Sequence, residues 1–246
     1  LHSLVKPKRG ASYVSKSPFC SGTLIAPDVV LTAAHCLAGR VAGGVYVSFH
    51  DDPIDAGSAF APIAGSALSI HPSYNSARLT DDVALLRLSV AQSVAPIALL
   101  PANGLDPTAP SVALAMDTSG RVLSNFAGFG YSVLTRKGAR VIKSGLGTLL
   151  QFDDVIEGVG CHIAGCPNSS DSSIDATQFA YTQGEGGVCN GDSGGPAFVF
   201  EGDRAAPTAV YVAGITSYGD ANCNVYGVST RVDAYKANFI AAFLAP

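Results

Sequence analysis

The sequence contains no tryptophan, a single methionine and few charged residues, which make up 14% of the chain. Its 246 residues carry 15 Lys and Arg against 19 Asp and Glu, and this net charge of −4 argues against a nucleic-acid-binding surface. The longest apolar runs, such as the stretch around Val29–Ala34, are far below the roughly 20 residues that span a bilayer, which excludes a transmembrane helix. We single out one basic cluster, Lys6, Lys8 and Arg9, and interpret it as a solvated tail.

The sequence also lacks a Cys-x-x-Cys pair with the spacing of a zinc site. Its 6 cysteines leave three readings open, namely free thiols, metal ligands or three disulfides. We disfavour a metal site, and we expect neither a metal nor an organic cofactor. The even cysteine count and the loops rich in Gly, Ser and Asn fit an oxidising compartment, so we expect a secreted protein, extracellular or periplasmic.

What the sequence does contain is a 48% share of apolar residues together with 27 Gly and 14 Pro. Short apolar runs recur along the chain, and Gly, Pro, Asn or Asp bound each of them. They are Ser12–Ser15, Ser21–Ile25, Val29–Thr32, Val45–Phe49, Ala67–His71, Ala84–Leu88, Ser111–Met116, Asn125–Gly128, Lys143–Leu150, Ala197–Phe200 and Val210–Ile215. This pattern predicts an all-β sandwich or barrel. No Ser/Gly-rich linker divides the chain, so we expect residues 1–246 to form a single unit.

The end of the chain shows a different periodicity. Tyr235, Phe239, Ile240 and Phe243 fall on one face at helical spacing, which predicts a C-terminal helix over residues 232–244 that docks on the body of the protein.

Three segments carry side chains suited to nucleophilic catalysis. Gly191–Pro196 places the hydroxyl of Ser193 among glycines, Thr32–Cys36 places a histidine after an apolar run, and Asp81–Leu88 places two carboxylates before another. Alone, each has a plain interpretation as a turn, a packed histidine or a strand cap. Together they supply a nucleophile, a base that accepts its proton and an acid that orients the base, which is the set of groups that acyl transfer requires.

At these residues the sequence resembles the trypsin/chymotrypsin-like serine proteases, whose triad has the chain order His, Asp, Ser. The order here is His35, Asp82, Ser193. Further landmarks follow the same order along nearly the whole chain. They are Phe19–Ile25, His71–Tyr74, Gly128–Gly130, Ser217–Gly219 and Val228–Val232. The resemblance implies a double six-stranded antiparallel β-barrel, with halves of roughly 1–105 and 106–230 and the site between them.

The resemblance implies a role for each residue of the triad. Ser193 would attack the scissile carbonyl, His35 would act as general base and then as acid, and Asp82 would fix the tautomer of His35. Asp82 is preferred to Asp81 because the acid of the family directly precedes an apolar-Ala-Leu-Leu run. The backbone N–H groups of Gly191 and Ser193 would form the oxyanion hole.

The family also suggests how the cysteines pair. Cys20 would bond to Cys36 beside the histidine, and Cys189 to Cys223 beside the specificity pocket. Cys161 and Cys166 match a third family bridge only in part, and we expect them to pair with each other.

The primary specificity pocket is expected to be uncharged. The resemblance places its floor at Gly187 and its walls near Gly219 and Gly227, with further lining residues that include Val188, Asn190, Ser217 and Tyr218. A pocket without a carboxylate predicts cleavage after apolar or aromatic residues. The rival specificity is cleavage after Arg or Lys, if Asp220 or Glu185 reaches into the pocket.

The start of the chain departs from the family pattern, in which a new α-amine pairs with the Asp before the nucleophile, here Asp192. The chain opens with Leu1-His2-Ser3-Leu4 instead. Three explanations stay open: Leu1 is an activated terminus, residues precede it, or another donor satisfies Asp192.

The expected function is that of a secreted serine endopeptidase. A non-catalytic homologue that uses the same fold as a binding module is the competing class, because fold does not imply function. The expected partners are polypeptide substrates and protein protease inhibitors, without nucleic acid or membrane, and we expect a monomer.

Overall fold

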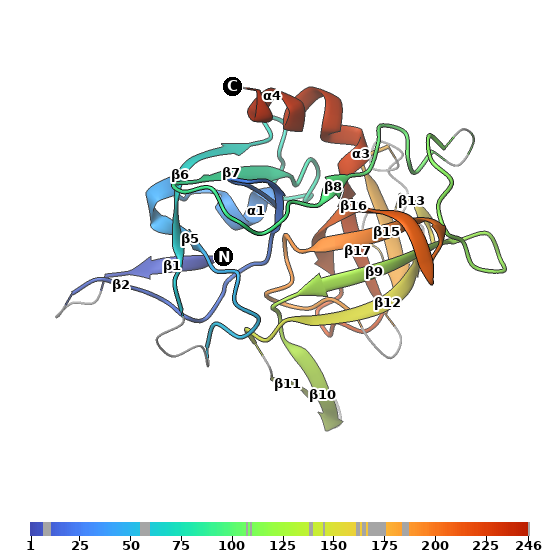
Figure 1. Ribbon diagram of the computed structural model, residues 1–246. Helices are drawn as coiled ribbons and strands as arrows, with labels where there is room; N and C mark the ends of the chain where they lie inside the picture. Colours follow the sequence, from blue (N-terminus) through green and yellow to red (C-terminus); the bar gives the residue numbers. More distant parts are fainter. Residues whose placement is uncertain are drawn as a thin grey trace.

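Two curled antiparallel sheets lie side by side in the computed structural model, and a helix ends the chain (Figure 1). The described residues are 1–6, 11–54, 60–106, 108, 110–137, 140–144, 146–160, 163, 166, 176–183 and 187–245. Within 132–137 and 140–144, only the course of the backbone is described.

The first sheet has seven strands in the order β2-β1-β5-β6-β7-β4-β3. Its strands are β1 (His2–Val5), β2 (Tyr13–Val14), β3 (Thr23–Ala26), β4 (Val29–Thr32), β5 (Val45–Val47), β6 (Ile63–Ile70) and β7 (Ala84–Leu88). Two short helical segments, α1 (Ala34–Leu37) and η1 (Ala42–Gly44), follow β4. Strands β4 and β7 pair with each other and are almost entirely buried, so they form the centre of the first core.

The second sheet has eight strands, seven in the order β12-β9-β15-β16-β17-β14-β13, with β8 pairing beside β16. Its strands are β8 (Ala98–Leu99), β9 (Val122–Gly128), β12 (Leu150–Ile156), β13 (Gly158–Val159), β14 (Gln178–Thr182), β15 (Pro196–Asp203), β16 (Ala206–Gly219) and β17 (Tyr226–Arg231). Strand β8 therefore joins the second sheet, although its residues precede position 105.

A two-stranded hairpin stands apart from both sheets. Strands β10 (Ser132–Lys137) and β11 (Arg140–Ser144) pair only with each other among the described strands, and the hairpin projects away from the body of the molecule (Figure 1).

The predicted terminal helix is present over residues 232–244. It consists of α3 (Val232–Tyr235), a π-helical turn η3 (Lys236–Ile240) and α4 (Ala241–Leu244). All four residues of the predicted apolar stripe pack into the core of the first sheet, which explains why the helix docks there. No feature of the sequence predicts the π-helical turn.

The expected fold class, an all-β double barrel, is confirmed, but the sheets have seven and eight strands where six each were expected. Two expected strands are wrong. Ser111–Met116 makes only isolated bridges at Leu114 and Met116, and Lys143–Leu150 spans the end of β11, a turn and the start of β12. All residues of strand β17 are buried. The strand was not predicted because Gly, Ser and Thr interrupt its run of apolar residues.

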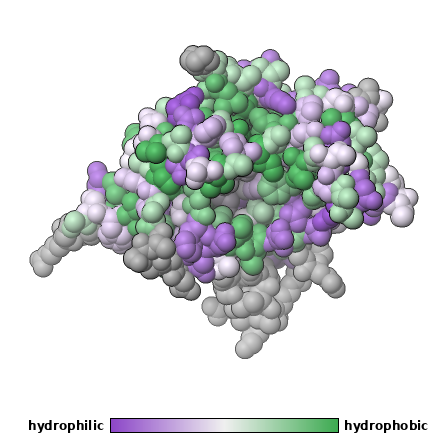
Figure 2. All heavy atoms as spheres, in the orientation of Figure 1, coloured by the Kyte–Doolittle hydropathy of each residue, from purple (hydrophilic) through white to green (hydrophobic). Residues whose placement is uncertain are grey.

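The space-filling view shows apolar residues gathered in the middle of one face, with hydrophilic residues around them (Figure 2). Within the part of the chain that is described, no helix has the length and apolar character needed to traverse a bilayer.

Candidate active site

Two paired strands of the first sheet position a histidine and an aspartate. Strand β4 ends at Thr32 and α1 follows at once with His35, whereas Asp82 stands just before β7. Because Thr32 pairs with Ala84 in antiparallel register, the segment after β4 and the segment before β7 meet at the same edge of the sheet.

His35 and Asp82 form a close pair at that edge. The Nδ1 atom of His35 lies 2.7 Å from Oδ2 of Asp82, and the backbone N–H of His35 donates to Oδ1 at 2.8 Å. The hydroxyl of Ser217 donates to Oδ2 at 2.5 Å. The Asp82 side chain is fully buried, while that of His35 is 25% exposed. An ionised carboxylate in this position needs such donors, and it favours the His35 tautomer with the proton on Nδ1.

The neighbouring carboxylate, that of Asp81, turns to another partner. Its Oδ1 accepts a hydrogen bond of 2.9 Å from the Tyr235 hydroxyl and lies 3.7 Å from Nδ1 of His71. Asp81 therefore ties the loop before β7 to the C-terminal helix and takes no part in the His35 pair.

Ser193 lies on the turn that precedes β15 of the second sheet. Its carbonyl oxygen contacts residues that adjoin strands of the first sheet. The backbone N–H of Ser21 donates to its carbonyl oxygen at 2.8 Å, and Cys36 Sγ lies 3.6 Å from the same oxygen. Cys36 directly follows His35 in the chain, so these contacts bring the candidate nucleophile and base to one place. Gly191, on the same turn, has φ +101°, a conformation that side-chain-bearing residues rarely adopt.

Two backbone donors of this turn have no acceptor among the described residues. Within the described part of the chain, the N–H groups of Gly191 and Ser193 donate no hydrogen bond. The carbonyl of Asn190 accepts from the backbone N–H of Tyr131 at 3.0 Å. Because the N–H and C=O of a trans peptide point in opposite directions, this bond aims the Gly191 N–H away from Tyr131. Backbone N–H groups without an acceptor are the kind of donor that can bind a developing oxyanion.

Asp192 is held by backbone donors. Gly130 N–H donates to its Oδ1 and Cys189 N–H to its Oδ2, both at 2.8 Å. Burial raises the pKa of Asp192 to about 6, and the two hydrogen bonds oppose that shift.

The suggested pairing of Asp192 with the α-amine does not occur in this structure. The Leu1 α-amine donates to the Cys20 carbonyl at 2.6 Å, and burial lowers its pKa to about 5. In this structure the backbone N–H groups of Gly130 and Cys189 satisfy the Asp192 carboxylate.

A cavity of about 350 Å³ adjoins Ser193. The predicted residues Val188, Asn190, Ser217, Tyr218 and Gly219 line it, together with Cys189, Thr216, Asp220, Ala221 and Cys223. Among the described residues that line it, Asp220 carries a carboxylate.

Two predicted lining residues, Gly187 and Gly227, lie outside this cavity. A Cβ on Gly187 would be 1.9 Å from the amide oxygen of Gln183, and a Cβ on Gly227 would be 2.4 Å from the ring of Tyr181. Both side chains are buried, so they fill the space next to these glycines. The absence of side chains at 187 and 227 therefore makes room for Gln183 and Tyr181.

The Asp220 carboxylate accepts hydrogen bonds from backbone N–H groups of its own loop. Its Oδ1 accepts the backbone N–H groups of Asn224, Val225 and Tyr226, and its Oδ2 accepts that of Asn222. Burial would raise the pKa of Asp220, but these donors outweigh burial and lower it. Glu185, the other acid named for the rival specificity, lies outside the described residues.

Two of the suggested disulfides are present. Cys20 is bonded to Cys36, and Cys189 to Cys223. Cys166 is also disulfide-bonded, whereas Cys161 lies outside the described residues.

The group formed by Cys20, His35 and Cys36 has the closeness of a metal site, since its ligand atoms lie within 4.8 Å of one another. The disulfide removes both thiolates, and the imidazole of His35 alone does not make a metal site.

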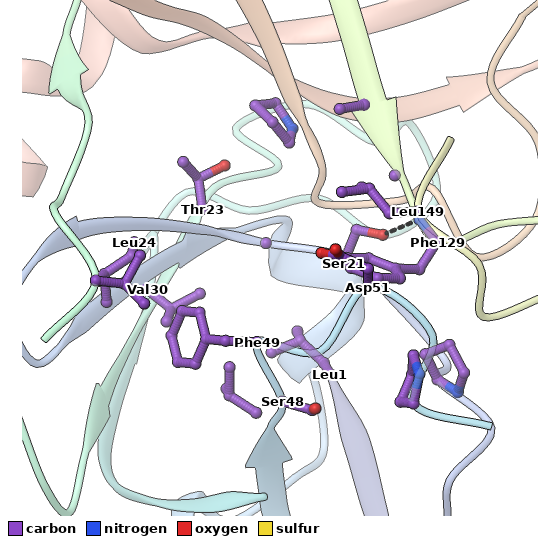
Figure 3. A pocket seen from close by; sticks show the side chains of 18 of the residues that line it. Leu1, Ser21, Thr23, Leu24, Val30, Ser48, Phe49, Asp51, Phe129 and Leu149 are labelled. Carbon is purple, nitrogen blue, oxygen red and sulfur yellow. Dashed lines mark hydrogen bonds between the residues drawn. The ribbon is translucent and has the colours of Figure 1, made fainter. Parts of the chain in front are cut away.

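A second cavity, of about 410 Å³, lies where the two sheets meet, and Ser21 forms part of its wall (Figure 3). The Ser21 hydroxyl accepts the backbone N–H of Phe129 and donates to the carbonyl of Gly191, both at 2.9 Å. These contacts of Ser21 could not be predicted from the sequence, because they join residues more than 100 positions apart.

Comparisons with known proteins agree with this geometry. The family described as "Trypsin" matches residues 5–128 and 129–239. Brachyurin of Leptuca pugilator is 30% identical over 190 residues, covering 77% of this chain and 75% of the relative. The "Inactive CLIP domain-containing serine protease A3" of Aedes aegypti is 29% identical over 228 residues, covering 87% and 44%. The solved structure of the VesB protease of Vibrio cholerae has a TM-score of 0.66 at 23% identity, and the match covers 99% of this chain but only 63% of VesB.

Proposed function

The chain belongs to the trypsin family of serine endopeptidases, and on that premise we propose that it hydrolyses polypeptides by acyl transfer to Ser193. The observation that carries the proposal is the buried Asp82 carboxylate. Its two oxygens accept hydrogen bonds from the His35 ring, the His35 backbone N–H and the Ser217 hydroxyl. A carboxylate held in this way keeps Nδ1 protonated, which leaves Nε2 of His35 to accept a proton from Ser193.

The reaction then proceeds in two stages. Ser193 Oγ forms a bond to the scissile carbonyl carbon while its proton passes to His35 Nε2, and the carbonyl oxygen becomes an oxyanion. The N–H groups of Gly191 and Ser193 bind that oxyanion. The C–N bond breaks as His35 returns the proton to the leaving amine, and a water activated by His35 releases the acyl group in the same manner.

We propose cleavage after uncharged apolar or aromatic residues. Val188 gives the cavity an apolar wall, and the Asp220 carboxylate is already stabilised by four backbone donors. Pairing with a cationic side chain would add little to a carboxylate with that many donors. Cleavage after Arg or Lys is therefore the less favoured of the two specificities.

We also propose that the protein is secreted. Disulfide bonds persist in oxidising compartments, and the described residues contain the pairs Cys20–Cys36 and Cys189–Cys223.

The test is digestion of a peptide library, with mass spectrometry to locate each cut. The wild-type chain should cut after Phe, Tyr, Leu or Met, and Ser193→Ala should lower kcat by roughly 10⁶-fold while its thermal unfolding stays unchanged. The matched control is Ser66→Ala, an exposed serine on β6 that should keep full activity. Cuts after Arg or Lys would replace the proposed specificity, and an inert wild-type chain would favour a binding module.

A further inference from the structure

The loop that leads into Asp82 has a strained backbone. Leu79 has φ +51° and Asp81 has φ +53°, in the left-handed region that residues with side chains, and leucine in particular, rarely adopt. Such a conformation persists only where the surrounding structure holds it. Because Asp82 directly follows Asp81, the contacts that hold residues 79–81 also set the position of the carboxylate beside His35.

Two buried or partly buried side chains from other elements hold the strained residues. The Tyr235 hydroxyl on α3 donates to Oδ1 of Asp81 at 2.9 Å. The Gln178 side chain on β14 donates from Nε2 to the carbonyl oxygen of Leu79 at 2.8 Å. Gln178 is fully buried. The second sheet therefore supplies a fixed donor to the first of the two strained positions.

The same Gln178 amide also contacts the strand that lines the cavity beside Ser193. The Tyr218 hydroxyl donates to Oε1 of Gln178 at 3.1 Å. A backbone carbonyl can only accept, so Nε2 of the amide must face Leu79, and Oε1 is left to accept from the Tyr218 hydroxyl. Both ends of one buried amide are thus used, and they join Leu79 to Tyr218.

Two neighbouring residues of β16 are connected to the segment that ends at Asp82. Ser217 donates directly to Oδ2 of Asp82, and Tyr218 reaches Leu79 through Gln178. Both Ser217 and Tyr218 line the cavity beside Ser193. The strand that lines the cavity and the loop that carries the acid are therefore joined at two points three residues apart.

Packing alone does not require an amide at position 178. Gln178 lies opposite Thr230 in the pairing of β14 with β17, and its chain neighbour Phe179 is fully buried in the second core. Burying an amide has a desolvation cost that its hydrogen bonds only offset, whereas an apolar side chain of the same length would fill the space without that cost. The amide is suited to fixing the two groups that it bonds.

We propose that Gln178 is a positioning residue that holds the loop of Asp82 against β16 and so keeps the Asp82 carboxylate aligned with His35. It acts through Leu79 and Tyr218. The proposal rests on the proposed function, in which Asp82 orients the base. A misaligned acid slows proton transfer from Ser193 while the cavity still binds substrate, so the effect should fall on kcat.

The first test is Gln178→Met, which keeps the length and burial of the side chain but removes both hydrogen bonds. On a short anilide substrate that ends at the scissile bond, kcat should fall about tenfold and KM should change less than about twofold. The matched control is Gln151→Met, an exposed glutamine on β12 that should keep the wild-type kcat. A Gln178→Met chain that melts earlier but keeps the wild-type kcat, at a temperature where it is folded, would show a structural role only.

The second test is a double-mutant cycle with Tyr218→Phe, which removes one hydroxyl and also serves if Gln178→Met does not fold. Tyr218→Phe alone should lower kcat about threefold. It should cause no further loss in the Gln178→Met background, because the connection is already broken there. Losses that multiply, or a Tyr218→Phe chain with the wild-type kcat, would contradict the bridge through Gln178.

A spectroscopic measurement tests the alignment without turnover. The proton on Nδ1 of His35, in its short bond to Asp82, should give a low-field signal in proton NMR of Ser193→Ala. Adding Gln178→Met or Tyr218→Phe should shift this signal to higher field, and adding Gln151→Met should leave it in place. A signal that neither of the first two substitutions moves would refute the positioning role. A wild-type chain that is inert on the anilide would instead contradict the proposed function, so the two failures are distinguishable.

Discussion

The hydroxyl of Ser21 donates a hydrogen bond of 2.9 Å to the carbonyl oxygen of Gly191. The same hydroxyl accepts the backbone N–H of Phe129, and the Ser21 backbone N–H donates to the carbonyl of Ser193. Ser21, which lies just before β3 of the first sheet, therefore holds both Gly191 and Ser193 of the turn that carries the two proposed oxyanion donors.

The substitution Ser21→Ala should lower kcat about tenfold and leave KM nearly unchanged. It removes the donor to Gly191 and leaves the partly buried N–H of Phe129 without its acceptor, a loss of about 1–1.5 kcal/mol in positioning the turn. Steady-state kinetics on a short anilide substrate that ends at the scissile bond measure kcat and KM separately. Ser66→Ala is the control, and an unchanged kcat in Ser21→Ala would show that the turn holds its shape without the Ser21 hydroxyl.

Asp192→Asn should reduce kcat by about 10- to 100-fold. An amide presents one acceptor where the carboxylate presents two, so the N–H of either Gly130 or Cys189 loses its partner. Since the pKa of Asp192 is raised to about 6, lowering the pH through 6 should protonate wild-type Asp192 and reduce activity in the same way. The pH dependence of the kcat ratio between the two chains is the measurement, and a ratio that stays constant from pH 5 to 8 contradicts this role.

Gly227→Ala should destabilise the protein, because the added methyl group would collide with the Tyr181 ring, which lies 2.4 Å from that position. Overpacking of this kind costs about 1–3 kcal/mol. The double variant Gly227→Ala/Tyr181→Leu should recover part of the loss in thermal unfolding. If Gly227→Ala unfolds at the wild-type temperature, the two residues do not compete for the same space.

Asp154→Asn should stabilise the protein at neutral pH. Burial raises the pKa of Asp154 to about 6, with a further contribution from Glu157, whereas the usual value in an unfolded chain is about 3.9. The folded state therefore holds the proton more tightly, and the free energy of unfolding falls as pH rises from about 4 to about 6. We expect the Asn variant to melt a few degrees above wild type at pH 7.5 and to show no gain at pH 3.5.

Asp153→Asn, at the neighbouring position of β12, is a control for which we expect a melting-temperature shift of the opposite sign. The pKa of Asp153 is lowered, chiefly by a hydrogen bond from Asn125 and also by Arg204. Its ionised form is favoured in the folded state, so this substitution should lower the melting temperature slightly at pH 7.5 and leave it unchanged well below pH 3. Equal melting shifts for the two variants would contradict both assignments.

The candidate catalytic side chains could be identified from the sequence because each stands in a distinctive local segment. His35 follows an apolar run directly, Asp82 precedes one, and Ser193 lies among glycines. The boundaries of less apolar strands could not be predicted in this way. Strand β17 is buried on both faces although Gly, Ser and Thr dilute its pattern, since its neighbours β14 and β16 provide the burial.

The pocket was harder to predict, because its shape depends on which side chains lie behind its walls. Glycines at 187 and 227 indicate open space in the sequence, but Gln183 and Tyr181 fill that space in the fold.

The sequence by itself determined the β-rich fold class, the terminal helix and the identity of the candidate triad, because short-range patterns of apolar residues, glycines and polar side chains carry that information. Only the tertiary structure decided that the Gly130 N–H donates to Asp192 and that Ser21 holds the turn around Ser193. These properties depend on contacts between residues more than 50 positions apart, and no local pattern encodes such contacts.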